Sequence, residues 1–203
     1  MTVVELGLRE RKKAATRAAL SRAAARLAVR RGVAAVTVEE IAAAAGVSPR
    51  TFHNYFPGKE EAIVAPLTDG AEAVIAGLRA RPAGEPIWES LRRVVRDVLL
   101  PSGAGGGVDT ETLALLRTVK ADPSLVARQL CGLGEMQRRI TEVIAGRTGT
   151  DPSRDLHPHL LAGAAGLALR TTVDLWADSG GTADLPALID EAFERLRAGL
   201  PGP

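Results

Sequence analysis

The feature that most limits the fold of this chain is an apolar pattern of helical spacing that runs almost from end to end. Over residues 9–31 this spacing places four apolar side chains on one face: Leu20, Ala23, Ala24 and Leu27. Gly32 then marks the expected end of the helix. Aromatic residues make up only 3% of the chain, and alanine and leucine dominate its apolar residues, which favours helices over strands. The sequence therefore predicts an all-α fold of about nine helices.

Proline and glycine divide the later part of the chain into further helices. A long helix is expected to run from Lys59 toward Arg79, with a kink or an early stop at Pro66. Beyond it the pattern predicts helices over residues 86–100, 110–119, 124–147, 155–177 and 185–200. The glycine-rich segment 102–107 is expected to be a flexible loop.

A capping box predicts the start of a short helix at Thr37. The Thr37 hydroxyl can accept a hydrogen bond from the N–H of Glu40, and the Glu40 carboxylate can accept one from the N–H of Thr37. The helix should be short, because Ala45-Gly46 interrupts it and the glycine permits the positive φ of a tight turn.

A second short helix is predicted directly after this turn. Ser48 can cap it, and Pro49 can occupy its first turn, where the missing N–H costs nothing. It should reach about Phe56, because Pro57-Gly58 follows. Two short helices joined by such a turn are typical of a helix-turn-helix.

The spacing in these two helices separates a core face from an outer face. Five apolar residues are placed to face inward: Ile41, Ala45, Val47, Phe52 and Phe56. Five others are left pointing mainly outward: Arg50, Thr51, His53, Asn54 and Tyr55. Arg50 can bond guanine, Asn54 can bond adenine, and the others can reach a phosphate or a thymine methyl group. Thr37 and Lys59, each at a helix start, are expected to contact phosphates.

Charge is distributed unevenly along the chain. Residues 1–59 contain eleven basic and four acidic residues, a net charge of +7, whereas the remainder has fifteen basic and twenty acidic residues, a net charge of −5. A basic head on an acidic body is typical of a nucleic-acid-binding protein, although a solvated basic helix would give the same count.

No catalytic or cofactor site is expected. Cys131 is the only cysteine, which excludes a disulfide within one chain, and we expect it to be a small core residue. His157-Pro158-His159 lacks a nearby third ligand, so loop histidines are expected rather than a metal site. The chain has no signal-peptide pattern and no apolar stretch of ~18 residues, so a cytoplasmic protein is expected.

The first quarter of the chain resembles the DNA-binding domain of the TetR family of bacterial repressors. The match is carried in order by Arg17, Leu20, Ala23-Ala24, Leu27, Gly32, Thr37, Ile41-Ala42, Ala45-Gly46-Val47-Ser48, Thr51, Tyr55-Phe56 and Lys59. It departs at His53, where the family often carries an aromatic residue. The resemblance implies a DNA-binding domain over residues 1–58 and a ligand-binding and dimerisation domain over residues 59–203. The expected DNA-binding set is Arg17, Thr37, Ser48, Pro49, Arg50, Thr51, His53, Asn54, Tyr55 and Lys59.

The resemblance also implies a homodimer whose last two long helices pair into a four-helix bundle. Two recognition helices would then enter successive major grooves of a palindromic operator, with half-sites ~34–36 Å apart. The candidate interface residues are Gly163, Gly166, Leu167, Leu188, Ala192, Phe193 and Leu196, although both surfaces could equally be intramolecular core.

A small hydrophobic effector that releases the DNA is a further implication. The candidate ligand-binding residues are Trp88, Leu91, Leu116, Arg117, Leu133, Met136 and Arg170, with ordinary core packing as the alternative for each apolar one. Arg170 lies in a mostly apolar helix, and burial there would require a partner such as Asp174 or a ligand anion.

The C-terminal half is similar to the acyl-CoA-responsive regulators of the mycofactocin system. The similarity rests on DPSLVARQL at residues 122–130, on residues 155–159 and on LPALIDEAFERL at residues 185–196. It implies a fatty acyl-CoA as the effector. An aromatic or drug-like compound that controls an efflux or catabolic gene is the alternative, and a small helical enzyme is a third interpretation.

Overall fold

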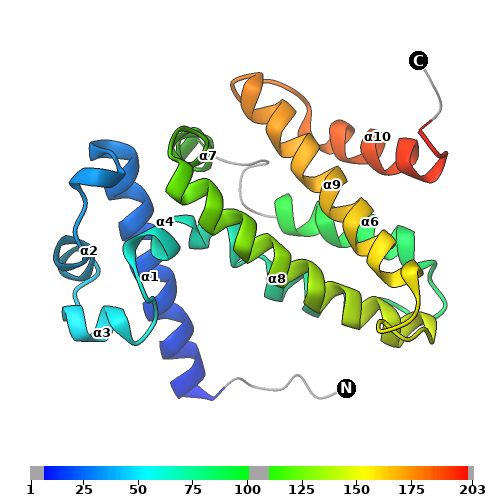
Figure 1. Cartoon of the computed structure of the whole chain (residues 1–203), viewed down its shortest axis with the longest axis horizontal. Coiled ribbons are helices and arrows are strands. Elements are labelled where there is room, and N and C mark those ends of the chain that lie inside the picture. Colours follow the sequence, from blue (N-terminus) through cyan, green and yellow to red (C-terminus); the bar gives the residue numbers. More distant parts are fainter. Residues whose placement is uncertain (1–6, 101–109, 201–203) are drawn as a thin grey trace. The chain divides into compact units, whose positions relative to one another are not determined.

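The computed structural model describes residues 7–100 and 110–200, and these residues form helices and no strand (Figure 1). The all-α prediction is confirmed for this part of the chain. The loop expected over residues 102–107 lies outside the described residues. None of the described helices combines the length and the apolar character needed to cross a membrane.

The chain divides into two compact units. The first comprises the chain up to Asp69 together with Ala114–Leu130. It holds α1 (Leu8–Arg31), the 3-10 helix η1 (Val33–Ala35), α2 (Val38–Ala44), α3 (Pro49–His53) and α4 (Lys59–Thr68). It also takes the C-terminal part of α7 (Thr110–Ala121) and the N-terminal part of α8 (Pro123–Thr148). The boundary predicted between residues 58 and 59, which separates the DNA-binding domain from the ligand-binding and dimerisation domain, stays a prediction.

The core of the first unit joins α1 to the two short helices and to α4. Its most buried side chains include Leu20, Ala24, Ile41, Phe52, Phe56 and Ile63. Ala45 and Val47, in the connection between α2 and α3, are half-buried against the same cluster. The inward face predicted for the helix-turn-helix is therefore confirmed.

The helix predicted over residues 59–79 is two helices, α4 and α5 (Ala71–Ala80), which are separated at Asp69–Gly70. Pro66 lies inside α4, where its missing N–H removes one hydrogen bond from the last turns. The N–H of Asp69 still donates to the carbonyl of Ala65 at 2.8 Å and closes the helix. The early stop expected near Pro66 is confirmed, and it coincides with the boundary between the two units.

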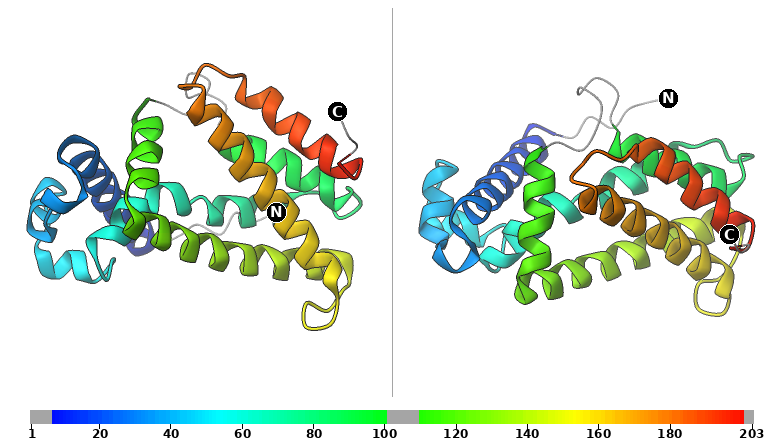
Figure 2. Two further views of the ribbon diagram at one scale, coloured as in Figure 1. Left: turned by 45° about the horizontal axis from the view of Figure 1, so that its top comes forward. Right: turned by 90° about the horizontal axis from the view of Figure 1, so that it is seen from above.

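The second unit comprises Gly70–Leu113 and the chain from Cys131 onward. Besides α5 and parts of α7 and α8, it holds α6 (Ile87–Leu99), α9 (Leu156–Asp178) and α10 (Leu185–Arg197). α10 packs beside α9 and also contacts α6 (Figures 1 and 2).

Aromatic and ionic contacts together hold α10 to α6. The rings of Trp88 and Phe193 lie with their centroids 4.8 Å apart, and Nε1 of Trp88 donates to the carbonyl of Phe193 at 3.1 Å. Arg92 donates to the Asp190 carboxylate at 2.6 Å, and Arg96 pairs with its second oxygen. The position of α10 within this unit is therefore fixed by contacts made inside one chain.

Gly77 of α5 lies where α5 and α6 approach closely, since a Cβ added there would lie 2.9 Å from Cγ1 of Val94. We expect Gly77→Ala to lower the free energy of unfolding by about 1–3 kcal/mol, because the methyl group overpacks this contact. Gly134→Ala in α8 is the matched control, because a Cβ there meets nothing within 4 Å. That variant should gain about 0.5–1 kcal/mol of stability. Urea denaturation measures both, and equal stabilisation of the two variants would contradict the close approach.

Candidate DNA-binding site

The start of α2 is fixed by the predicted capping box. The Thr37 hydroxyl accepts a hydrogen bond from the N–H of Glu40 at 3.2 Å, and the Glu40 carboxylate accepts one from the N–H of Thr37 at 3.0 Å. Arg31, at the end of α1, donates to the same carboxylate at 2.7 Å. The Arg31 hydrogen bond is the main reason that the pKa of Glu40 lies below its ordinary value. The carboxylate thus ties the ends of α1 and α2 together.

The turn between α2 and α3 also follows the predicted chemistry. Gly46 has a φ of +70°, and the N–H of Val47 donates to the carbonyl of Ala42 at 2.9 Å. Ser48 caps α3 by accepting a hydrogen bond from the N–H of Thr51 at 3.1 Å, and Pro49 is the first helical residue. α3 ends at His53, earlier than predicted, and residues 54–56 continue as hydrogen-bonded turns that still bring Phe56 into the core.

The outer edge of α3 presents polar side chains to solvent. Arg50, His53 and Asn54 are exposed, whereas Thr51 and Tyr55 are half-buried. The Thr51 hydroxyl also shares a hydrogen bond with the Ser48 hydroxyl, at 2.9 Å between the oxygens. Of the predicted base-contacting residues, Arg50 and Asn54 therefore have the freest access to a ligand.

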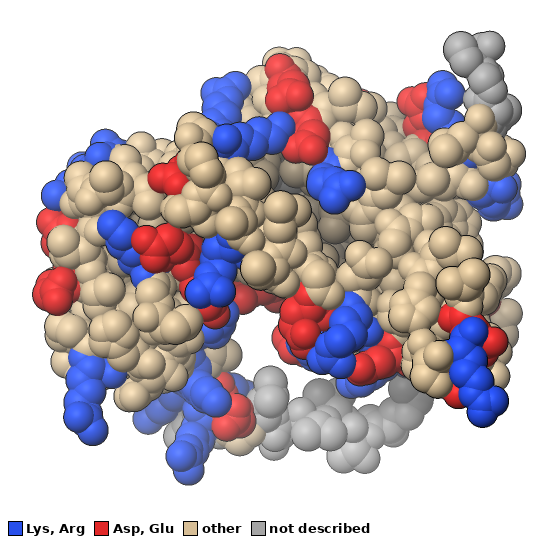
Figure 3. Space-filling view, viewed as in Figure 1, with Lys and Arg blue, Asp and Glu red and all other residues tan. Residues whose placement is uncertain are grey.

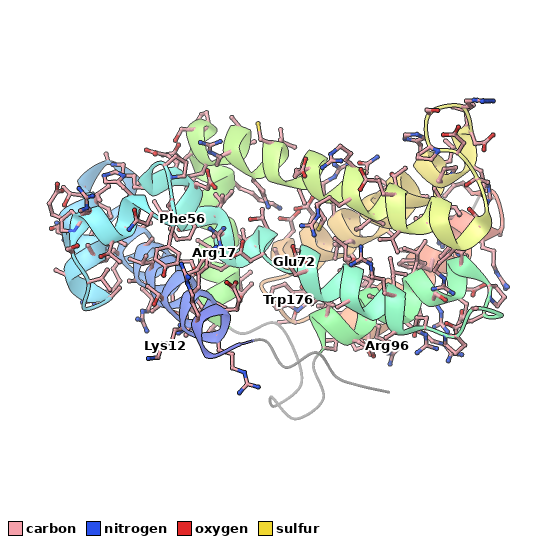
Figure 4. The ribbon with its side chains drawn as sticks, turned by 90° about the horizontal axis from the view of Figure 1, so that it is seen from below. Lys12, Arg17, Phe56, Glu72, Arg96 and Trp176 are labelled. Carbon is pink, nitrogen blue, oxygen red and sulfur yellow. The ribbon has the colours of Figure 1, made fainter. Side chains whose placement is uncertain are left out.

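Arg17 lies among internal partners rather than at the outer surface of the helix-turn-helix. Its Nε and one terminal nitrogen donate to the two carboxylate oxygens of Asp69 at 3.1 and 3.0 Å. The other terminal nitrogen donates to the carbonyl of Tyr55 at 3.0 Å. The guanidinium carbon lies 4.2 Å from the centre of the Phe56 ring (Figure 4). Sequence reasoning assigned Arg17 to DNA and did not identify Asp69, because these partners are far away along the chain.

Lys59 is likewise turned inward. Its Nζ donates to the carbonyls of Val33 and Val36, each at 2.9 Å, and the side chain is half-buried. These carbonyls belong to η1 and its C-terminal cap. Lys59 therefore binds the connection between α1 and α2, and the structure does not direct it toward a phosphate.

Exposed cations remain on the first unit. Lys and Arg side chains project from the parts of this unit that hold α1 and α3 (Figure 3). Arg22 and Arg30 of α1 and Arg50 of α3 are all exposed. Such a surface attracts a polyanion without regard to its sequence.

The candidate ligand-binding residues are divided between the two units. Leu116 and Arg117 belong to the first unit, and the remaining candidates belong to the second: Trp88, Leu91, Leu133, Met136 and Arg170. Leu91 is buried, Leu133 and Met136 are half-buried, and Trp88 is engaged with Phe193. Arg170 is exposed on α9, so within one chain it needs no buried partner.

A surface hollow of about 410 Å³ lies in the second unit, at residues that the sequence did not single out. It is lined by Arg79, Arg81, Ala83, Glu142, Val143, Gly146 and Arg147. Two of these arginines are already engaged, since Arg81 pairs with Glu85 and Arg147 donates to the carbonyls of Leu78 and Pro82. A ligand in the hollow would therefore meet two arginines that are already engaged within the chain.

The candidate dimer residues have different surroundings. Phe193 is 0% exposed and packs on Trp88 of its own chain, as the intramolecular-core alternative for this residue expects. Gly163 is half-buried, and a Cβ there would lie 3.5 Å from the Gln137 side chain of α8. Gly166 and Leu167 are exposed, whereas three others are half-buried: Leu188, Ala192 and Leu196. Sequence reasoning missed three exposed leucines of α9: Leu156, Leu160 and Leu175.

Two further expectations need correction. Cys131 is exposed on α8, not a core residue, because this part of α8 leaves that face uncovered within the chain. His157 and His159 lie in the first turn of α9 rather than in a loop, and Nε2 of His159 lies 2.7 Å from the carbonyl oxygen of Pro152. No group of three possible metal-ligating side chains lies together in the described ranges.

Comparison with known proteins agrees with this geometry. Residues 20–65 match the family described as bacterial regulatory proteins, tetR family, and residues 85–201 match the MftR C-terminal domain. HTH-type transcriptional regulator TcmR of Streptomyces glaucescens is 36% identical over 200 residues, which cover 96% of this chain and 88% of TcmR. Both resemblances drawn from the sequence are confirmed, and the matched proteins are regulators rather than enzymes.

Solved structures share the fold at low sequence identity. NalD, the secondary repressor of the MexAB-OprM multidrug efflux pump in Pseudomonas aeruginosa, has a TM-score of 0.59 and 17% identity, covering 92% of this chain and 97% of NalD. FadR from Thermus thermophilus, solved in complex with lauroyl-CoA, has a TM-score of 0.55 and 23% identity, covering 92% of this chain and 96% of FadR. These likenesses show the all-α regulator fold.

Proposed function

Because this chain belongs to the TetR family of bacterial regulatory proteins, we propose that it is a ligand-responsive repressor that binds a palindromic operator as a homodimer. Residues 1–58 would read DNA, and residues 59–203 would bind the effector and the second copy. The observation that carries the proposal is α3, which exposes Arg50 and is followed by the exposed C-terminal cap residue Asn54. Ser48 caps the N-terminus of α3, and the pair formed by Phe52 and Phe56 holds the segment in the core.

The chemistry of α3 suits a major groove. An arginine can donate two hydrogen bonds to guanine, and an asparagine can form a donor–acceptor pair with adenine. Thr37 and Ser48 cap the starts of α2 and α3, and in the proposed complex the backbone N–H groups and hydroxyls at these helix starts would contact phosphates. His53 and Tyr55 would add contacts to the DNA backbone, and the exposed Pro49, at the start of α3, would lie against it.

A second copy of the chain would cover α9. Four of its leucines are exposed by 43–75%: Leu156, Leu160, Leu167 and Leu175. Their spacing of four, seven and eight residues places them along one side of the helix. An exposed apolar row of this kind is typical of a surface that becomes buried in an assembly. Gly166, where a Cβ would meet nothing within 4 Å, leaves room for close approach on the same helix.

The proposed effector is a fatty acyl-CoA or a similar small hydrophobic molecule. The match to the MftR C-terminal domain and the fold shared with an acyl-CoA-bound FadR support this class. The fold shared with NalD, a repressor of a multidrug efflux pump, supports the alternative of an aromatic or drug-like effector.

The function is tested by selecting duplexes that the purified protein retains from a randomised DNA pool. We expect one enriched palindromic sequence, and a long-chain acyl-CoA should release the protein from it in a fluorescence anisotropy assay. Free CoA and a detergent at matched concentration serve as controls. Failure to enrich any sequence would overturn the proposed function. Enrichment without release would contradict an acyl-CoA effector and favour an aromatic or drug-like one.

Arg50→Ala should cost about 1–3 kcal/mol of binding free energy on the selected duplex and relax the preference at one base pair. The reason is the loss of a bidentate contact to one base. Arg22→Ala is the control, since Arg22 is an exposed arginine on α1 and should affect all sequences alike. Anisotropy titrations against single-base variants of the duplex measure this. Unchanged discrimination in Arg50→Ala would remove this residue from the base-contacting set.

Leu160→Glu combined with Leu167→Glu should convert the protein to a monomer, because each charge would have to be buried in the proposed interface. Leu130→Glu is the control, as Leu130 is 55% exposed on α8 and lies outside the proposed surface. Sedimentation equilibrium should give twice the chain mass of 21.2 kDa for the wild type and the control. A dimeric double variant would show that α9 is not the interface.

A further inference from the structure

The Arg17 guanidinium is held in place by hydrogen bonds within its own chain, an arrangement that binding a phosphate would not require. Its Nε and one terminal nitrogen donate to the two oxygens of the Asp69 carboxylate, and its other terminal nitrogen donates to the carbonyl of Tyr55. All three nitrogens therefore already have an acceptor within the unit. Arginine is suited to this use, because its donors are fixed in one plane and its charge also stacks on aromatic rings such as Phe56.

The partners of Arg17 come from places that matter for DNA reading. Tyr55 lies two residues beyond α3, and its N–H donates to the carbonyl of Phe52. The carbonyl of Tyr55 therefore lies at the end of the turn that closes α3. Asp69 is the C-terminal cap of α4 and the last residue of the first unit before the chain enters the second. Arg17 thus joins the end of α3 to the end of α4 across the core residue Phe56.

The pair is too exposed to be a main source of stability. The side chains of Arg17 and Asp69 are 34% and 41% exposed, and ion pairs at such positions contribute little to the free energy of unfolding. The contacts act instead on geometry, because the carbonyl of Tyr55 accepts only when the end of α3 is in one position.

We propose that Arg17 is a positioning residue for DNA recognition. Arg17 is anchored by Asp69 and fixes the position of the end of α3 relative to the end of α4. It does not bind phosphate. This inference rests on the proposed function, and it assigns a role in specific binding to Asp69, a carboxylate that would otherwise only repel DNA.

The two roles of Arg17 predict opposite effects of Asp69→Asn. If Arg17 is a positioning residue, Asp69→Asn loosens its anchor and weakens binding to the selected duplex, about five- to tenfold, a loss similar to that of one base contact. If Arg17 binds phosphate, Asp69→Asn frees the guanidinium and removes a negative charge near DNA, so binding is unchanged or tighter. Glu10→Gln, which removes an exposed carboxylate of α1, controls for the change in net charge.

Arg17→Lys separates charge from geometry, because lysine keeps the charge and loses the fork. The positioning role predicts weaker binding to the selected duplex, nearly unchanged binding to an unrelated duplex, and a salt dependence with the wild-type slope. A phosphate contact predicts nearly wild-type binding for Arg17→Lys and a slope lower by about one for Arg17→Ala.

Anisotropy titrations over a range of salt concentrations, on the selected and the unrelated duplex, supply these readings. Thermal melting followed by circular dichroism should change little in Asp69→Asn and Arg17→Lys. Unchanged or tighter binding by Asp69→Asn, or equal loss on both duplexes, would overturn the inference. A wild type that selects no sequence would instead be a failure of the proposed function, so the two outcomes are distinguishable.

Discussion

A helix of five residues has almost no stability of its own in water, so α3 depends on the contacts that hold it in place. Phe52 and Phe56 are 0% and 1% exposed, and their burial against α1 and α4 supplies the main anchoring free energy. Ser48 and Pro49 determine where the helix begins. With its apolar side and its N-terminus fixed in this way, α3 can only present Arg50 and its polar neighbours outward.

The positive charge of the first unit serves two purposes. Arg17 and Lys59 direct their charges to carbonyl and carboxylate oxygens inside the unit and so hold its connections in shape. Arg22, Arg30 and Arg50 are exposed, and they can attract DNA and contact it. A count of basic residues does not distinguish the cations that are engaged inside the unit from those that are exposed. The engaged cations nevertheless determine how the exposed ones are arranged.

The sequence predicted best what depends on neighbouring residues. The capping box at Thr37 and the start of α3 at Ser48 involve groups three residues apart, and both are confirmed. The acceptors of Arg17 lie 38 and 52 residues away, so its inward position could not be predicted. The sequence left open whether Arg170 is exposed and whether Phe193 is buried within one chain, because the spacing of long helices rich in alanine and glycine does not show which side another helix covers.

In the proposed complex, two copies of α3 read DNA one helical turn apart. Hydroxyl-radical footprinting of the wild-type protein on its selected duplex tests this most directly. We expect two protected segments on the same face of the duplex, with centres about 10–10.5 base pairs apart or a multiple of that spacing. A single protected segment, or protection with no fixed spacing, would contradict it.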